Sequence, residues 1–145
     1  MKIPTKMSVA MPTSDHSEVY NLFFDHHPDN IMYDDVRDFL NNSQNICIRH
    51  AKTDKILGVI FFKKDSDGCA EIVNMVVDKN YRRCTLGTTL TDFLVKNKSY
   101  REVYITVNEM KLEFQLFLKS LGFKCGKVLK SEFPQNRDGY FFVHS

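Results

Sequence analysis

The sequence has little of what would place it at once in a specialised class of proteins. Its four cysteines lie far apart, without a C-x-x-C pair or a histidine at metal-ligand spacing, so neither a disulfide framework nor a zinc module is expected. No segment has the length of a membrane span, and residues 1–11 lack the apolar stretch of a signal peptide. We therefore expect a soluble, cytoplasmic protein with reduced thiols, no metal and no membrane partner.

An excess of one charge is also missing. The 20 lysines and arginines nearly balance the 18 aspartates and glutamates, and the basic residues are spread along the chain. This gives no electrostatic reason to expect nucleic acid as a partner. The chain has 145 residues, of which 43% are hydrophobic and 26% charged, as in an ordinary globular protein. We expect one domain, residues 1–145, with a core of its own.

Apolar residues at helical spacing predict four helices. The first starts after an N-cap at Ser14 and is broken by Pro28 and Asn30. The other three cover residues 33–40, 86–97 and 109–121, and Gly122 is expected to close the last one.

Strands are predicted between and after these helices, and together with the helices they indicate an α/β fold. They cover residues 7–11, 45–51, 56–64, 69–77, 102–107, 123–133 and 139–143. Residues 72–77 are almost continuously apolar, as expected of a central strand covered on both faces.

A basic loop separates this central strand from the helix over residues 86–97. Backbone N–H groups at such a junction point outward, and the helix dipole adds partial positive charge, so the junction suits a phosphate group. Arg82 and Arg83 add full charges, and Gly87 lets the backbone approach a ligand closely. An ordinary strand–loop–helix connection with two solvated arginines would have the same pattern, so the loop alone leaves both interpretations open.

The loop and its surroundings resemble the GNAT superfamily of N-acetyltransferases. In that family Arg/Gln-x-x-Gly-x-Gly/Ala follows a strand that ends in Val. Here Val77 ends the strand, Arg82 opens the loop, Thr85 replaces the first glycine and Gly87 keeps the second. A second family segment, Val-x-x-x-Asn-x-x-Ala-x-x-Leu-Tyr-x-x-x-Gly-Phe, is matched at the same offsets by Val107, Lys111, Phe114, Phe117, Leu118, Gly122 and Phe123.

The resemblance implies a single-domain GNAT fold, with a mixed, mostly antiparallel central sheet flanked by about four helices. It also implies acetyl-coenzyme A (acetyl-CoA) as the cofactor, with its arm between the strands over residues 72–77 and 102–107. The backbone of the first of these strands would bond the pantetheine arm and the acetyl carbonyl, the loop would hold the pyrophosphate, and the last helix would contact the cofactor. The strand residues implied are Met75, Val76 and Val77, and the helix residues are Lys111 and Phe114. The loop residues implied are Arg82, Arg83, Cys84, Thr85, Leu86, Gly87 and Thr88.

The activity implied is transfer of an acetyl group to a primary amine, by direct attack in a ternary complex. Ala70-Glu71-Ile72-Val73 resembles the strand start of the histone-type members, in which the matching glutamate is the general base. Glu71 is therefore the candidate catalytic residue, although a solvent-facing strand glutamate is the other interpretation. The same match favours a protein or peptide amine, on a lysine or an N-terminus, over a small amine.

Three departures from the family pattern favour an alternative, a binding module of the same fold with impaired catalysis. Thr85 resists a positive φ, Lys111 replaces an asparagine, and Leu118 replaces the tyrosine that protonates the departing thiolate. A nucleic-acid adaptor is a third possibility, and it would require binding with a steep salt dependence. Elsewhere, the adjacent His26 and His27 are not expected to share a metal.

Overall fold

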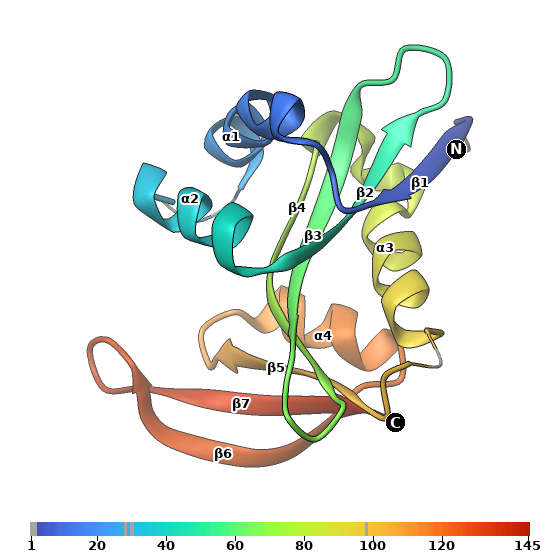
Figure 1. The fold of residues 1–145 in the computed structure, drawn as a ribbon. Coiled ribbons are helices and arrows are strands. Elements are labelled where there is room, and N and C mark those ends of the chain that lie inside the picture. Colours follow the sequence, from blue (N-terminus) through green and yellow to red (C-terminus); the bar gives the residue numbers. More distant parts are fainter. Residues whose placement is uncertain (1–2, 28, 30, 98) are drawn as a thin grey trace. The chain divides into compact units, whose positions relative to one another are not determined.

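The computed structural model describes residues 3–27, 29, 31–97 and 99–145, without the side chains of residues 82–84. Its elements follow the order β1 (Thr5–Val9), η1 (Thr13–Asp15), α1 (His16–His26), α2 (Tyr33–Asn42), β2 (Gln44–His50), β3 (Ile56–Lys64), β4 (Ala70–Val77), η2 (Lys79–Cys84), α3 (Leu86–Val95), β5 (Val103–Asn108), α4 (Leu112–Ser120), β6 (Lys124–Phe133) and β7 (Arg137–His144) (Figure 1). The strands are hydrogen bonded in the order β1-β2-β3-β4-β5-β7-β6. The β4–β5 pair is parallel, whereas β1–β2, β2–β3, β5–β7 and β6–β7 are antiparallel.

The chain divides into two compact units. Unit 1 contains Met1–Lys63 and Ile72–Phe93, and unit 2 contains Lys64–Glu71 and Leu94–Ser145. The boundary falls within β4, so the first two residues of this strand belong to unit 2 and the remainder to unit 1.

Unit 1 has helices on both faces of its strands (Figure 1). One buried cluster joins α1 and α2 to β2, β3 and β4, and includes Val19, Phe23, Val36, Cys47 and Phe61. Burial raises the pKa of the Cys47 thiol to about 12. This thiol therefore behaves as a small hydrophobic group in the core.

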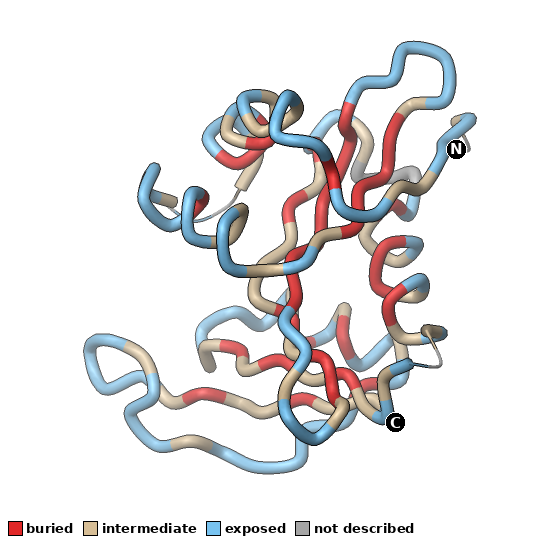
Figure 2. The backbone as a smooth tube through the Cα atoms, viewed as in Figure 1, coloured by how far each residue is buried: buried red, intermediate tan, exposed pale blue. Residues whose placement is uncertain are grey.

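The other face of the same strands packs against α3. A Cβ added at Gly58 of β3 would lie 3.1 Å from Leu90 and 3.2 Å from Ile48. A larger residue would push the helix away, so glycine sets how closely α3 approaches the sheet. The continuous red of β3 in Figure 2 shows that this strand is buried from Ile56 to Phe62.

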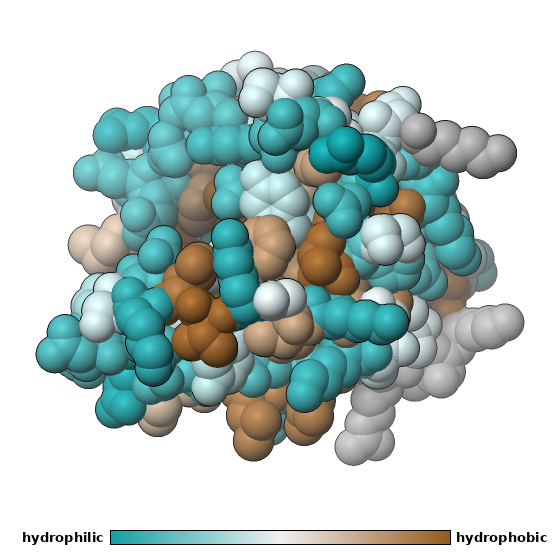
Figure 3. All heavy atoms as spheres, turned by 90° about the horizontal axis from the view of Figure 1, so that it is seen from below, coloured by the Kyte–Doolittle hydropathy of each residue, from teal (hydrophilic) through white to brown (hydrophobic). Residues whose placement is uncertain are grey.

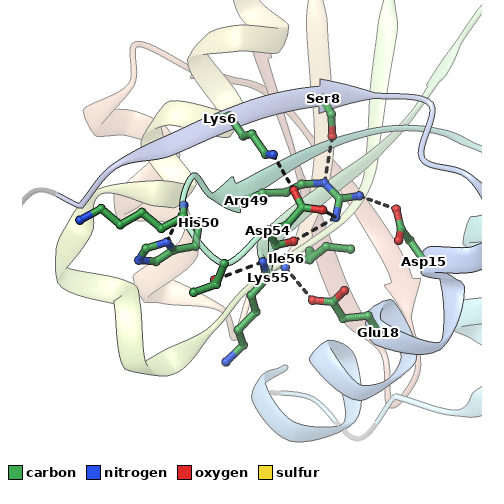
Figure 4. A network of polar contacts seen from close by, with 11 residues as sticks. Lys6, Ser8, Asp15, Glu18, Arg49, His50, Asp54, Lys55 and Ile56 are labelled. Carbon is green, nitrogen blue, oxygen red and sulfur yellow. Dashed lines mark hydrogen bonds and ion pairs between the residues drawn. The ribbon is translucent and has the colours of Figure 1, made fainter.

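A polar network closes the end of unit 1 where the N-terminal segment meets the β2–β3 turn (Figure 4). Its centre is Arg49, which is only 7% exposed. The guanidinium donates to Asp15 Oδ2 at 2.5 Å, to the Asp54 carbonyl at 3.2 Å and to Ser8 Oγ at 3.4 Å. Beside it, the Ile56 backbone N–H donates to Glu18 Oε2 at 2.6 Å, so α1 is tied to β3 as well.

Unit 2 is built around β5. This strand pairs in parallel with the start of β4, through Ala70↔Val103 and Glu71↔Tyr104, and antiparallel with β7. Helix α4 ends in a Schellman motif, in which the Gly122 N–H bonds to the Lys119 carbonyl and the Phe123 N–H to the Leu118 carbonyl. Gly122 has φ +93°, as a C′ glycine requires.

Most of the predicted elements are confirmed, but several details of the prediction were wrong. Asp15, not Ser14, precedes α1 as its N-cap. Phe93 has the spacing of an apolar-face residue in the predicted helix over residues 86–97, but it is 43% exposed. Of residues 72–77 only Ile72 and Val76 are buried, and Val73 and Met75 are half-buried. The helix breakers Pro28 and Asn30 lie outside the described residues.

The predicted start of α4 at residue 109 was also wrong, because Asn108 ends β5 with a turn. Its Oδ1 accepts the Met110 N–H at 3.0 Å and its carbonyl accepts the Lys111 N–H at 2.9 Å. A side chain that bonds its own backbone two residues on offers the chain an alternative to helix. The helix therefore begins only at Leu112.

Large hydrophobic side chains also occur at the surface. Met110, Leu112 and Leu116 of unit 2 are each more than half exposed, at 61%, 62% and 56%. The face drawn in Figure 3 is mostly hydrophilic, with hydrophobic residues in separate patches. In the described part of the chain, no helix has both the length and the hydrophobicity to cross a membrane.

Candidate functional site

The predicted strand–loop–helix segment is present in unit 1 as β4, η2 and α3. Thr85 lies between the last two of these elements, in the left-handed conformation with φ 57° and ψ 29°. This is the position at which the family pattern has its first glycine. The backbone therefore takes the path that a glycine would permit, although a β-branched residue occupies the position.

The first three amides of the loop are bonded to protein groups. The Lys79 N–H donates to His26 Nδ1 at 3.2 Å, and the Asn80 N–H donates to Asp78 Oδ1 at 2.9 Å. The Tyr81 N–H donates to the Asp78 carbonyl at 2.9 Å. Amide donors for an anion would therefore have to come from residues after Tyr81, where the prediction placed them. The side chains of Arg82, Arg83 and Cys84 lie outside the described part, so their contacts with a ligand remain predictions.

The first turn of α3 contributes mainly backbone to the candidate site. Leu86 is only 3% exposed, so its side chain belongs to the core. Gly87 is helical, and its carbonyl accepts the Thr91 hydroxyl at 2.8 Å. The Thr89 hydroxyl donates to the Thr85 carbonyl at 3.0 Å, so both hydroxyls bond to their own helix. Thr88 is half-buried, and its contact with the pyrophosphate of the cofactor remains a prediction.

The C-terminal end of β4 carries the predicted backbone partners of the pantetheine arm, Met75, Val76 and Val77. The Met75 N–H donates to Asn74 Oδ1 at 2.7 Å. The same oxygen lies 3.0 Å from His27 Nε2. A ligand carbonyl that used the Met75 N–H would therefore take the place of the Asn74 amide oxygen. The Asn74–His27 pair was not identified from the sequence, since it joins residues 47 positions apart.

Glu71 lies in unit 2, beside Tyr104 in the β4–β5 ladder. Its neighbours in the strand, Ala70 and Ile72, are buried, whereas Glu71 is half-buried, so its side chain is on the less covered face. Register partners share a face, and Tyr104 on that face donates to Asp65 Oδ2 at 3.2 Å. The Tyr104 ring packs against Phe141, with 5.2 Å between ring centroids.

The protonation states of Tyr104 and Asp65 follow from the contacts of these two side chains. Burial, with the nearby Glu71 carboxylate as the second cause, raises the pKa of Tyr104 to about 12. The Cys69 and Asp67 backbone N–H groups donate to Asp65, and the first of these has the largest effect in lowering the pKa of that carboxyl. At neutral pH the face therefore holds a protonated tyrosine and an ionised aspartate beside Glu71. Asp65 and Tyr104 were missed from the sequence, because only the strand register brings Tyr104 to Glu71 and only the fold brings Asp65 to Tyr104.

The other candidates of unit 2 lie on α4. Lys111 is the exposed N-cap residue, and the half-buried Phe114 stacks on Phe117 with 5.9 Å between centroids. Leu118 is 1% exposed and faces the core.

Gln115, which was not predicted, is 6% exposed and donates to the Asn108 and Glu109 carbonyls, so it fixes the end of β5. Among the described residues, no three His, Cys, Asp or Glu side chains gather as a metal site would require.

The conformation of Thr85 leads to a stability prediction. We expect Thr85→Gly to raise the free energy of unfolding by about 1 kcal/mol, because removing the left-handed strain of a β-branched residue outweighs the backbone entropy of glycine. Chemical denaturation would measure the change. Thr85→Ala is the control, since alanine also has a Cβ at positive φ and is expected to gain less. Equal gains in the two variants would contradict strain at this position.

Three comparisons with known proteins bear on the site. A family model described as "Acetyltransferase (GNAT) family" matches residues 13–123. No curated protein matches the chain. Solved structures share its fold: the ribosomal-protein-S18-alanine N-acetyltransferase from Escherichia coli has a TM-score of 0.79 at 17% identity, covering 96% of this chain and 92% of that chain.

Two further structures were solved with acetyl-CoA bound. A GNAT family acetyltransferase from Elizabethkingia anophelis has a TM-score of 0.76 at 15% identity, over 99% of both chains. NAA60 from Arabidopsis thaliana has a TM-score of 0.75 at 16% identity, over 97% of both chains. At such identities these structures show the fold alone, whereas the family model covers most of the sequence. The chain belongs to the acetyltransferase (GNAT) family.

Proposed function

We propose that the chain transfers the acetyl group of acetyl-CoA to a primary amine, which attacks the thioester directly. The observation that carries this proposal is the backbone of β4, η2 and α3, in which Thr85, at the position of the family's loop glycine, has a left-handed conformation of the kind that glycine permits. The pyrophosphate would then be held by residues 82–88. The pantetheine arm would lie along Met75, Val76 and Val77, and Lys111 and Phe114 would complete the cofactor contacts.

Glu71 is proposed as the base of the reaction. A primary amine such as lysine has a pKa of about 10.4, so it must lose a proton before it can attack. The half-buried carboxylate of Glu71 lies beside Tyr104, whose raised pKa keeps its hydroxyl protonated, and can take the amine proton directly or through water. A backbone N–H of β4 would stabilise the oxyanion of the tetrahedral intermediate.

Departure of the thiolate is proposed to proceed without a side-chain acid at position 118. Leu118 is buried, and its side chain has no exchangeable proton. A thiol has a pKa of about 8.5, so its thiolate is a fair leaving group in water. Solvent would then protonate it after the carbon–sulfur bond breaks.

The acceptor is proposed to be an amine of a protein or peptide, on a lysine or an N-terminus. The carboxylates of Glu71 and Asp65 on the less covered face of unit 2 would attract a cationic amine before it is deprotonated. The neighbour from Escherichia coli, named as acting on an alanine of a ribosomal protein, supports this class of acceptor.

Titration calorimetry with acetyl-CoA, followed by acetyl-transfer assays on peptide and small-amine panels, tests the proposal. Binding together with transfer to a peptide amine is the expected result. Binding without transfer to any amine would instead favour the impaired binding module, for which the buried Leu118 is the specific observation. No binding of acetyl-CoA would overturn both functions.

A further inference from the structure

We propose that His26, the last residue of α1, positions the loop that begins at Asp78. The inference rests on the proposed function, because it takes acetyl-CoA to be the ligand of this loop. His26 reaches both groups that open the loop, although it is 52 and 53 residues away from them in the sequence. Its Nδ1 lies 3.2 Å from the Lys79 backbone nitrogen, and its Nε2 lies 3.6 Å from Asp78 Oδ1.

A single neutral tautomer of His26 serves both contacts. Since Nδ1 accepts the Lys79 N–H, the ring proton is assigned to Nε2, which faces the Asp78 carboxylate. The side chain of His26 is only 12% exposed, so the ring is held between the two groups. The imidazole therefore acts as a bridge from α1 to the first turn of η2.

Asp78 makes this bridge necessary, because its side chain is fully buried at 0% exposure. A buried carboxylate is costly unless charged or hydrogen-bonding groups surround it. Three elements supply such groups: His26 from α1, Lys55 from the β2–β3 turn with Nζ 3.3 Å from Oδ2, and the Asn80 N–H at 2.9 Å from Oδ1. His26 differs from the other two because it also accepts a backbone donor of the loop.

The two ring nitrogens therefore have separable effects. The Nε2–H group faces the buried Asp78 carboxylate, and this contact contributes to stability. The Nδ1 contact fixes the Lys79 peptide, from which the chain continues into residues 82–88. Losing the Nδ1 acceptor should weaken acetyl-CoA binding and leave the chemical step at Glu71 unchanged.

Two substitutions separate these effects. His26→Asn retains an acceptor near the position of Nδ1, whereas His26→Gln retains only a donor near the position of Nε2. We expect His26→Gln to raise the Kd and KM for acetyl-CoA about 5-fold, the usual value of one hydrogen bond, with kcat unchanged. His26→Asn should bind acetyl-CoA like the wild type. Equal affinities of the two variants, or a loss of kcat at constant KM, would overturn the inference.

A matched control comes from a second histidine of unit 1. His50 Nδ1 accepts the Lys52 N–H, also at 3.2 Å, but in the β2–β3 turn. His50→Ala therefore removes the same kind of contact from another loop, and it should leave acetyl-CoA binding unchanged. Weakening by His50→Ala equal to that by His26→Gln would overturn the inference, because the effect would then not be specific to this loop.

A ligand-free measurement separates failure of the inference from failure of the proposed function. If the wild type does not bind acetyl-CoA, the proposed function fails, and the role of His26 is then judged from the amide exchange of Lys79 measured by NMR. Faster exchange in His26→Gln than in His26→Asn would support the positioning role. Equal exchange in the two variants would overturn it.

Discussion

Replacing Glu71 with glutamine is expected to lower kcat for acetyl transfer by about 10²–10⁴-fold at neutral pH, the usual contribution of a positioned base. Glutamine keeps the shape of the side chain but cannot take the proton of the attacking amine. The remaining rate should rise about tenfold per pH unit below the amine pKa, because only the free amine then reacts. Initial rates against pH, at saturating acetyl-CoA, measure both effects.

Glu102→Gln is the matched control for this variant. Glu102 is also a half-buried glutamate of unit 2, and it precedes β5, with its carboxylate next to Cys69. The Glu102→Gln variant removes the same charge close to the β4–β5 ladder without changing the proposed base, so kcat should stay within a few-fold of the wild type. Comparable losses in the two variants would indicate a general electrostatic effect, and an unchanged kcat in Glu71→Gln would remove Glu71 from the mechanism.

The Arg49 network should dominate the stability of the N-terminal part of unit 1. Asp15→Ala is expected to lower the free energy of unfolding by about 3 kcal/mol, because it leaves the buried guanidinium without its closest carboxylate. Burial by itself lowers the pKa of Arg49, but in the wild type the pairing with Asp15 outweighs burial and raises the pKa. Without Asp15 the guanidinium still stays charged at neutral pH, because the ordinary pKa of arginine is about 12.5 or higher. Thermal unfolding should show a Tm lower by roughly 6–12 °C.

Asp34→Ala provides the comparison for an exposed ion pair. Asp34 contacts Arg37 at 2.9 Å, but the two side chains are 78% and 56% exposed. Such a pair contributes within about 1 kcal/mol, so the Tm should barely move. A loss of stability as large as that of Asp15→Ala would mean that burial of Arg49 is not the cause.

The order of the elements could be predicted from the sequence because hydrophobic periodicity records which residues are buried. Val19, Leu22 and Phe23 are at helical spacing, and all three are buried on one face of α1. The boundaries were less predictable, since local side-chain bonds override periodicity. Asn108 delays the start of α4 in this way, by capping the Met110 amide. Phe93 has helical spacing but is exposed, because periodicity alone does not mark where the core ends.

The candidate site was predictable where it is contiguous in sequence. The strand, loop and helix around Thr85 follow one another, so their chemistry could be inferred from the pattern. His26 and His27 reach the same segment only through tertiary packing, and Asp65 meets Tyr104 only through the hairpin and the strand register. No spacing in the sequence indicates such pairs.

The bonding of the Lys79, Asn80 and Tyr81 amides has a consequence for binding thermodynamics. Because protein groups satisfy these donors before any ligand arrives, the entropy of ordering this stretch is lost during folding and not during association. An anion held by the residues that follow would meet a preorganised backbone. The affinity for the anion would then depend on the charges of the loop and on the amides after Tyr81. Ordering of residues 79–81 would add little to the conformational entropy lost on binding.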